Sequence, residues 1–357
     1  MMTLLHKKVL STYWKVKDKH MAVDFALLIG INHYPEYHPL SGAHPDVEAM
    51  FDWLKDPNGG GIEDTSRIVT VLSNDSPVEP LHDEVDKAFE EVYKKAIINP
   101  ESCRRFYFYF SGHGIGLQSD DDNGLCMANW SEFRPASVIS SEEYRSEVVK
   151  SGLFEEVIFL LDCCRSRSLN RRGLFPLFSW LPKEEGPVST RYIVGYATLH
   201  NDESFESQQH DKYRGHFTTA LLNGLKGGAA RNGQITLHEL QDYVRSETIR
   251  LSEQTGMHQQ ARFRNSGFDQ ATFRVLFNSV MEKKIRCNFD FGSGIEGKYL
   301  LINGATNSSI DEWENPTGVI SVHLDPVFHA IVYSADRSAI IKSVFVEAGK
   351  EVINVTV

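Results

Sequence analysis

Several features are scarce in this 357-residue sequence, and each absence narrows what the protein can be. No apolar run approaches the roughly 20 residues needed to cross a bilayer, and the first 20 residues lack the apolar core of a signal peptide. The five cysteines show no CxxC spacing, which argues against a disulfide framework or a zinc site. Basic residues are also outnumbered by acidic ones, which gives a net charge of −11. We therefore expect a cytoplasmic protein in a reducing compartment, without a nucleic-acid or membrane partner.

What is present suffices for a large core, since 41% of the residues are apolar and 24% are charged. Aromatic and β-branched runs alternate along the chain with segments that carry apolar side chains at helical spacing. This alternation predicts an α/β fold with a mostly parallel sheet flanked by helices. The predicted strands cover 25–31, 67–72, 106–110, 157–161 and 191–198, with an edge strand at 271–277, and the predicted helices cover 46–54, 85–98 and 217–225, with others opening at 141 and at a capping box over 236–239.

After about residue 280 the pattern changes to period two, which is typical of strands with one buried face. This predicts a small C-terminal antiparallel β domain, most simply a sandwich. The sequence thus divides into a leader (1–21), an α/β domain (22–278) and a β-sandwich-like domain (279–357). The role of the last domain stays open between a partner-binding or regulatory module and a stabilising cap.

Two of the predicted strands deliver reactive side chains at their carboxyl ends. The run 106–110 continues into Ser111-Gly112-His113-Gly114, and the run 157–161 continues into Asp162-Cys163-Cys164. Side chains at this edge of a parallel sheet face the crevice where such folds bind ligands. A thiol has an ordinary pKa of about 8.5 and becomes a nucleophile at neutral pH only beside a base. His113 is the candidate base.

These two motifs, with the His about 50 residues before the Cys, resemble the caspase and metacaspase superfamily of cysteine peptidases. The resemblance covers about 22–278, and it assigns the nucleophile to Cys164 and a structural role to Cys163. Caspases carry Gln-Ala-Cys-Arg-Gly at the nucleophile, whereas metacaspases and bacterial relatives have Asp at the position of Asp162. The resemblance implies a caspase-like sheet and peptide hydrolysis by a Cys164/His113 dyad. It places the oxyanion on the backbone N–H groups of Gly114 and Cys164.

The resemblance also implies a substrate with Arg or Lys at P1, the residue before the scissile bond. Asp162 lies where metacaspase-like enzymes place a carboxylate in S1, the P1 pocket, and Asp46 matches a second S1 acid. Asp46 suits equally well an acidic position in the first turn of a helix. The stretch from 196 resembles the family's substrate loop, which pairs with the peptide main chain, although a solvated loop is the alternative. Its predicted substrate-binding residues are Tyr196, Ala197, Thr198, Asp202 and Glu203, and its acids, Glu206 included, could add a preference for cations.

Two charged segments allow further hypotheses. The basic loop after the nucleophile lies where the family has its intersubunit linker, so its arginines are either self-processing sites or solvated side chains; they are Arg165, Arg167, Arg171 and Arg172. The acidic tract Asp120, Asp121 and Asp122 offers the oxygen ligands that Ca²⁺ prefers, without the order of a dedicated calcium loop. We expect no cofactor beyond this calcium hypothesis.

By resemblance, the protein is a regulated effector of a stress, cell-death or antiviral defence response. An activating protein partner would then engage the C-terminal β domain. A catalytically silent caspase-like scaffold that assembles partners is the competing hypothesis. A nucleotide enzyme is disfavoured, because Gly112-His113-Gly114-Ile115-Gly116 is not a GxGxxG motif and acidic residues follow it.

Overall fold

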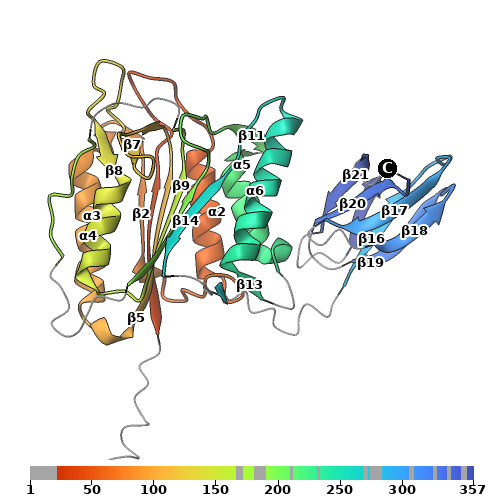
Figure 1. Ribbon diagram of the computed structural model, residues 1–357, viewed down its shortest axis with the longest axis horizontal. Coiled ribbons are helices and arrows are strands. Elements are labelled where there is room, and N and C mark those ends of the chain that lie inside the picture. The colour runs from red at the N-terminus through yellow and green to blue at the C-terminus, as the bar shows by residue number, and fades with distance from the viewer. Residues whose placement is uncertain are drawn as a thin grey trace, which may run out of the picture.

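A six-stranded sheet forms the centre of the first domain, in the order β14-β10-β9-β5-β1-β2 (Figure 1). The computed structural model describes residues 22–165, 172–180, 190–209, 212–230, 234–267, 272–273, 284–304, 309–324, 328–335, 339–346 and 352–357. Five strands of the sheet are parallel, and β14 pairs antiparallel with β10 at one edge. The strands are β1 (Val23–Gly30), β2 (Ile68–Leu72), β5 (Cys103–Ser111), β9 (Glu156–Asp162), β10 (Arg191–Tyr196) and β14 (Arg262–Ser266).

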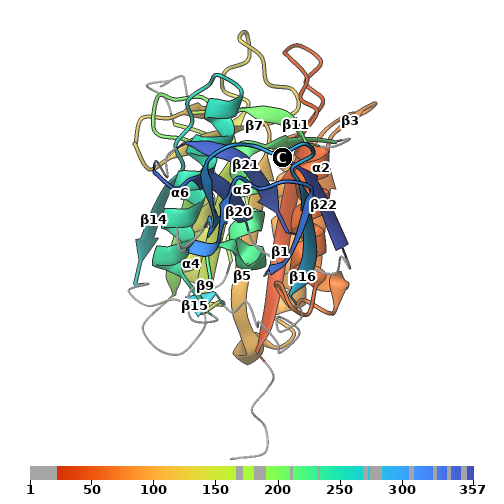
Figure 2. The ribbon, with the colours of Figure 1, turned by 90° about the vertical axis from the view of Figure 1, so that its right-hand side faces the viewer.

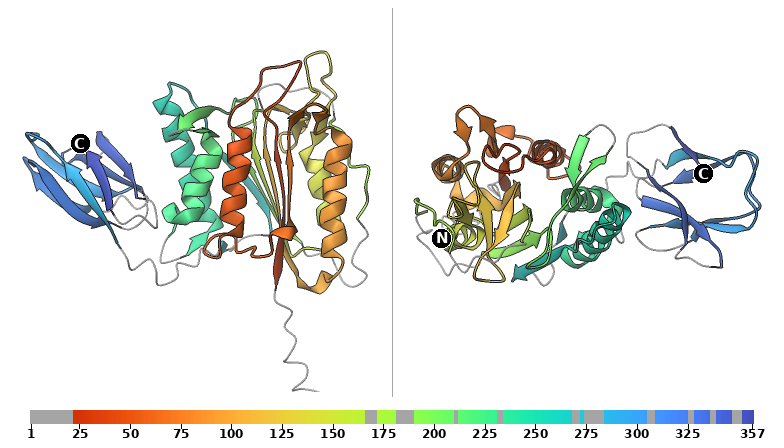
Figure 3. Two further views of the ribbon diagram at one scale, coloured as in Figure 1. Left: turned by 180° about the vertical axis from the view of Figure 1, so that it is seen from behind. Right: turned by 90° about the horizontal axis from the view of Figure 1, so that it is seen from above.

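Helices cover both faces of this sheet, as Figure 1 and the view from above in Figure 3 show. Helices α3 and α4 bury their apolar side chains on one face, and α2, α5 and α6 bury theirs on the other. The capping box predicted at 236–239 is present at the start of α6. The helices are α2 (Ala43–Lys55), α3 (His82–Ala96), α4 (Ser141–Ser151), α5 (His216–Asn223) and α6 (Leu237–Gln254), with 3-10 turns at Thr65–Arg67 and Pro100–Ser102 and a π turn at Gly224–Gly228.

The central strands are apolar on both sides, which is why their sequences are continuous apolar runs. In β5, Phe106, Phe108 and Phe110 face the core beneath α3 and α4. Tyr107 and Tyr109 face the core beneath α2, α5 and α6. Side chains alternate between the faces of a strand, so a strand buried on both faces needs an uninterrupted apolar run. The predicted fold class, a mostly parallel sheet flanked by helices, is confirmed.

Short hairpins decorate the sheet, and two of them lie at the carboxyl ends of the parallel strands, at the top of Figure 1. One is the three-stranded meander β6-β7-β8 and the other is the pair β11-β12. The hairpin strands are β3 (Asn74–Asp75), β4 (Val78–Glu79), β6 (Gly114–Gly116), β7 (Asn123–Cys126), β8 (Val138–Ser140), β11 (Glu206–Gln209) and β12 (Lys212–Gly215). Strands β13 (Ile235–Thr236) and β15 (Thr272–Phe273) pair with each other from distant parts of the chain.

The C-terminal strands form a separate two-sheet body, which appears beside α5 and α6 in Figure 3 and in front in Figure 2. One sheet has the order β19-β16-β22 and the other β18-β17-β20-β21, with Phe289, Leu301 and Trp313 in the core between them. Pairing is antiparallel except between β16 and β22. The strands are β16 (Ile285–Asp290), β17 (Lys298–Asn303), β18 (Ser309–Glu314), β19 (Val319–Leu324), β20 (Phe328–Tyr333), β21 (Ile340–Phe345) and β22 (Val352–Thr356).

One predicted strand is wrong. The edge of the main sheet is β14 (Arg262–Ser266), whereas 272–273, from the predicted strand 271–277, pair with β13 in a separate small sheet. An edge strand keeps one side open to water, so its polar sequence Arg-Phe-Arg-Asn-Ser carried no apolar signal. The leader (1–21) and the boundary at 278 lie outside the described residues, and the domain limits stay predictions. Within the described parts of the chain, no helix combines the length and apolar character needed to cross a membrane.

The alternating core predicts an uneven response to aromatic truncation. Phe159 in β9 is fully buried in the core beneath α3 and α4, with its ring centroid 4.5 Å from that of Phe108, so Phe159→Ala should lower the free energy of unfolding by about 3–5 kcal/mol. Phe133→Ala is the matched control, because that ring is 96% exposed. Urea unfolding followed by circular dichroism measures both, and equal stabilities of the two variants would contradict the assigned core.

Candidate active site

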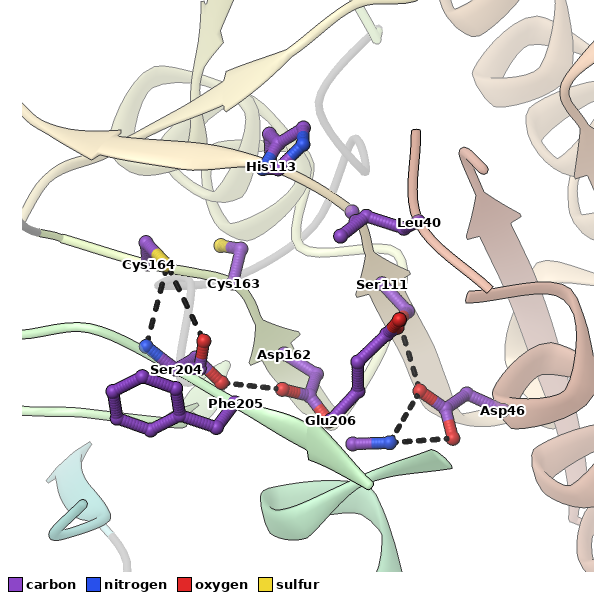
Figure 4. Close-up of a pocket in the computed structure, with 12 residues that line it drawn as sticks. Leu40, Asp46, Ser111, His113, Asp162, Cys163, Cys164, Ser204, Phe205 and Glu206 are labelled. Carbon is purple, nitrogen blue, oxygen red and sulfur yellow. Dashed lines mark hydrogen bonds between the residues drawn. The ribbon is translucent and has the colours of Figure 1, made fainter. Parts of the chain in front are cut away.

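The pairing register of β5 and β9 brings the two reactive side chains together. Ser111 at the end of β5 pairs with Asp162 at the end of β9, and the N–H of Gly112 donates to the Asp162 carbonyl at 3.2 Å. His113 and Cys164 each lie two residues beyond this pair. Both line one pocket at the carboxyl edge of the sheet (Figure 4).

His113 is held by main-chain and aromatic contacts. Its Nε2 lies 2.7 Å from the carbonyl oxygen of His38, so Nε2 carries the proton and donates it to that oxygen. Its ring packs between Tyr34 and Tyr37, with centroids 4.7 and 4.9 Å away, and its backbone N–H donates to the Tyr34 hydroxyl at 2.8 Å. Burial lowers the pKa of the His113 imidazole below its ordinary value. The ring is therefore neutral at pH 7, with Nδ1 left as the proton acceptor.

The Cys164 thiol is engaged by a single neighbouring peptide. Its Sγ accepts the N–H of Ser204 at 3.3 Å and donates to the carbonyl of Ser204 at 3.5 Å. Burial raises the pKa of the Cys164 thiol to about 11, against the smaller lowering effect of the Ser204 N–H. The resting site is thus a neutral thiol beside a neutral imidazole. Cys163 points to the opposite side of the sheet, where it is buried and its sulfur accepts from Asn123 at 3.0 Å.

Two buried carboxylates form the floor of the pocket. Asp162 accepts hydrogen bonds from the Ser204 hydroxyl at 2.9 Å and from the Thr218 N–H at 3.0 Å. Asp46, in the first turn of α2, accepts from the Ser111 hydroxyl at 3.0 Å and from the Gly215 N–H at 3.2 Å. Both therefore sit at the N-terminus of α5, where the helix dipole favours negative charge.

Burial nevertheless raises the pKa of both carboxyl groups, and their mutual repulsion raises that of Asp46 further. No Lys or Arg is among the described residues that line this pocket. Gly215 makes the close approach to the acids feasible, because a Cβ there would lie 2.1 Å from Oδ2 of Asp162. The described lining thus offers these acids no basic side chain, and Arg214, which lies outside it, has only a smaller lowering effect on the pKa of Asp46.

A third carboxylate lines the same pocket from the other side. Glu206, at the start of β11, accepts the backbone N–H groups of Ser41 at 3.1 Å and Gly42 at 2.8 Å. Gly42 is the N-cap of α2, so this carboxylate also meets a helix N-terminus. Of the three acids that the sequence offers in the substrate loop, Glu206 lines the pocket, whereas Asp202 and Glu203 do not.

The rest of the predicted substrate loop is corrected in the same way. Tyr196, Ala197 and Thr198 are completely buried behind the pocket and do not line it. They are the last residue of β10 and the two residues after it. Ala197 extends the pairing with β9, because its N–H donates to the Leu161 carbonyl at 3.0 Å. The exposed part of the loop begins at 199, and Ser204 to Glu206 are the residues that reach the pocket.

Comparison with known proteins identifies the family of this chain. A family model described as the caspase domain matches residues 23–271, which is most of the chain. The chain belongs to the caspase-domain family. The resemblance predicted from the His and Cys motifs is thereby confirmed, and the matched range spans every residue of the pocket.

Individual relatives of this caspase-domain protein are distant. A probable protease from a Desulfuromonadales bacterium is 28% identical over 233 residues, which make up 62% of this chain and 28% of that protein. The chain thus spans little more than a quarter of that relative. Caspase-1 from Spodoptera frugiperda is 12% identical with a TM-score of 0.46, covering 70% of this chain and 90% of the other. A Geobacter sulfurreducens protein is 16% identical with a TM-score of 0.41, covering 69% and 94%.

The arginines after Cys164 of this caspase domain have different environments. Arg165 is fully buried, with its guanidinium 4.4 Å from the ring centroid of Tyr196, and its backbone N–H donates to the Asp202 carbonyl at 2.9 Å. Burial of the Arg165 side chain argues against self-processing after this residue. Arg167 and Arg171 lie outside the described residues, and Arg172 is exposed.

The acidic tract proposed for calcium is divided among other partners. Asp120 lies 3.5 Å from His200, and Asp121 pairs with Arg264. Asp122 is buried, where it accepts from the Ser140 hydroxyl at 2.7 Å and the Glu142 N–H at 3.0 Å and so caps the start of α4. Among the described residues, no group of three or more His, Cys, Asp or Glu side chains gathers to hold a metal ion.

The resting thiol has a measurable signature. We expect the rate at which iodoacetamide alkylates Cys164 to keep rising with pH beyond about pH 10, because only the thiolate reacts and its pKa is raised to about 11. Mass spectrometry of the labelled peptide separates this signal from the other four cysteines, which are buried. A plateau below about pH 8 would instead reveal a preformed thiolate.

Proposed function

We propose that this caspase-domain protein is a cysteine endopeptidase that cleaves after Arg or Lys, with Cys164 as nucleophile and His113 as base. The observation that carries the proposal is the pocket itself. The thiol, the imidazole and three carboxylates (Asp46, Asp162 and Glu206) line one cleft, and no Lys or Arg is among the described residues that line it. A thiol and an imidazole in one cleft support hydrolysis, and the acids support the choice of substrate.

A basic P1 side chain would offset the burial of these carboxylates and the repulsion between them. The raised pKa values of Asp46 and Asp162 mean that burial and repulsion work against their negative charge. A guanidinium between them would supply the missing opposite charge and donate several hydrogen bonds in a planar fork. An acidic P1 side chain would add to the repulsion. Binding of a basic residue therefore gains more here than binding of a neutral or acidic one.

In the proposed reaction, Nδ1 of His113 takes the Sγ proton of Cys164 as the sulfur attacks the P1 carbonyl carbon. The C–N bond breaks, the imidazolium returns the proton to the leaving amine, and a thioester remains. Water, deprotonated by the same imidazole, hydrolyses the thioester and restores the thiol. The His38 carbonyl supports these steps by keeping the Nε2 proton in place, which fixes the tautomer with Nδ1 free.

Gly114 is suited to bind the oxyanion. The Cys126 N–H donates to the His113 carbonyl at 3.0 Å, so the next pair, Gly114 and Leu125, is a non-hydrogen-bonded pair of the antiparallel ladder. The Gly114 N–H then points away from β7. A Cβ at Gly114 would lie 2.6 Å from the Cys164 carbonyl, so only glycine permits this approach to the nucleophile.

A cleavage profile of a peptide library with the purified protein tests activity and P1 preference together. We expect cleavage after Arg and Lys, and none with Cys164→Ala. Preference for Asp at P1 would contradict the assignment of the acidic pocket. If no cleavage occurs under any condition, and Cys164 reacts with peptidyl-Arg electrophiles no faster than with iodoacetamide, the catalytically silent scaffold is favoured instead.

Glu206 provides a sharper test of the P1 pocket. Glu206→Gln removes one negative charge but keeps an oxygen for the N–H groups of Ser41 and Gly42. We expect kcat/KM for Arg substrates to fall by about 10- to 100-fold, the loss expected for a charged hydrogen bond. Glu48→Gln is the control, because it removes the same charge from an exposed position on α2. Equal kinetics of the two variants would exclude Glu206 from S1.

Further roles are proposals supported by family resemblance alone. They are a cytoplasmic location, a regulated function in stress, cell death or antiviral defence, calcium activation, self-processing at Arg172 or the neighbouring arginines, and activation by a protein that binds the C-terminal sandwich. The two-sheet architecture of residues 285–356 is compatible with such a binding module.

A further inference from the structure

The segment Ser204–Glu206 is fixed at three points, two within residues 162–164 and one at the start of α2. At its start, the Ser204 peptide contacts the nucleophile Sγ through both N–H and carbonyl. The Ser204 hydroxyl donates to Asp162 at 2.9 Å, and Glu206 is bonded to the first residues of α2. Its position relative to the thiol therefore determines whether the thiol is covered or free to react.

One buried side chain secures this segment from below. Gln259 is completely buried, and its amide nitrogen donates to the Ala197 carbonyl at 3.0 Å and to the Ser204 hydroxyl at 3.1 Å. Its amide oxygen accepts the N–H of Phe205 at 3.0 Å. The backbone N–H of Gln259 in turn donates to the Ser252 hydroxyl at 2.9 Å, in the last turn of α6. A single amide thus joins β10, the pocket segment and α6.

We propose that Gln259 is a positioning residue. It holds the segment Ser204–Glu206 in the position in which Ser204 covers the resting thiol, and this is also the position in which the segment pairs with a substrate peptide. Only the part of this inference that concerns pairing with a substrate peptide rests on the proposed peptidase function. Gln259 lies outside the pocket lining, so it acts through Ser204 and Phe205 and not on the substrate.

The chemistry of the amide explains why glutamine suits this position. Two of its partners are acceptors facing the amide N–H₂, and the third is a donor facing the amide oxygen. Glutamate would have no N–H for the Ala197 carbonyl, and methionine would have no polar group for any of the three. Because the site excludes water, each lost partner leaves a buried polar group unsatisfied. The segment would then shift to find water or other partners.

Gln259→Met, which keeps the shape and removes the polar groups, tests the proposal, with Gln260→Met as the matched control on the adjacent residue. We expect iodoacetamide to alkylate Cys164 about three- to tenfold faster at pH 8 in Gln259→Met, the factor expected for one or two lost hydrogen bonds. The direction follows because burial of the thiol outweighs its bond to the Ser204 N–H. With peptidyl-Arg substrates, we expect KM to rise. The number of active sites found by titration should stay the same.

These readouts separate positioning from general stability. A merely destabilised protein loses titratable sites while the remaining ones keep the wild-type KM and alkylation rate. Wild-type KM and alkylation rate in a folded Gln259→Met would overturn the proposal. The alkylation measurement needs no substrate, so it tests Gln259 even if the library profile finds no peptidase activity.

If Gln259→Met does not fold, Ser204→Ala provides the second measurement. It removes the hydroxyl shared by Gln259 and Asp162 and leaves the peptide that covers the thiol. We expect alkylation of Cys164 to become faster in this variant too, and, where both variants fold, the double variant to show less than the product of the two single effects. An alkylation rate equal to the wild type in Ser204→Ala, or multiplicative effects in the double variant, would show that Gln259 does not act through Ser204.

Discussion

The in-register pairing of β5 with β9 is the constraint on which the site depends. Ser111 opposite Asp162 puts two strand ends level at one edge of the sheet, and His113 and Cys164 follow two residues later. The alternation of side chains then directs Ser111 and Asp162 to the face covered by α2 and α5, and Cys163 to the opposite face. A register slip of one residue would turn the Asp162 side chain into the α3–α4 core and shift His113 relative to Cys164.

The same pairing explains how a cluster of carboxylates can persist in a folded interior. Asp162 and Asp46 share the N-terminus of α5, and Glu206 meets the N-terminus of α2, so each acid accepts backbone N–H groups that have no partner within a helix. Burial still raises the pKa of both aspartates. Under the proposed function, this pocket would receive a cation, and keeping its acids buried has a cost in stability, which is common at sites arranged for function.

The state of the thiol links this pocket to the substrate segment. Ser204 contacts the sulfur of Cys164 with its peptide and Asp162 with its hydroxyl, so the proposed nucleophile and the proposed P1 pocket share one neighbour. A peptide that pairs with this segment competes for the groups that now cover the sulfur. A neutral, covered thiol also suits a protease that is inactive until its substrate segment is rearranged.

How much of this could be predicted from the sequence follows from the range of each interaction. The strands that carry His113 and Cys164 were predictable because burial on both faces requires a continuous apolar run, and the motifs after them end at the sheet edge. Asp162 and Asp46 could be identified because the resemblance to caspases and metacaspases assigns those positions. The polar edge strand β14 could not, since one of its sides faces water and leaves no apolar pattern.

The sequence by itself determined the fold class, the two reactive residues and two of the acids, because these depend on local apolar pattern and on motif. Only the tertiary structure decided that the His38 carbonyl orients the imidazole, that Ser204 covers the thiol, that Glu206 joins the pocket, and that Gln259 supports it from far along the chain. Main-chain carbonyls and amides are present at every residue, so nothing in the sequence marks the one that packing brings to the site.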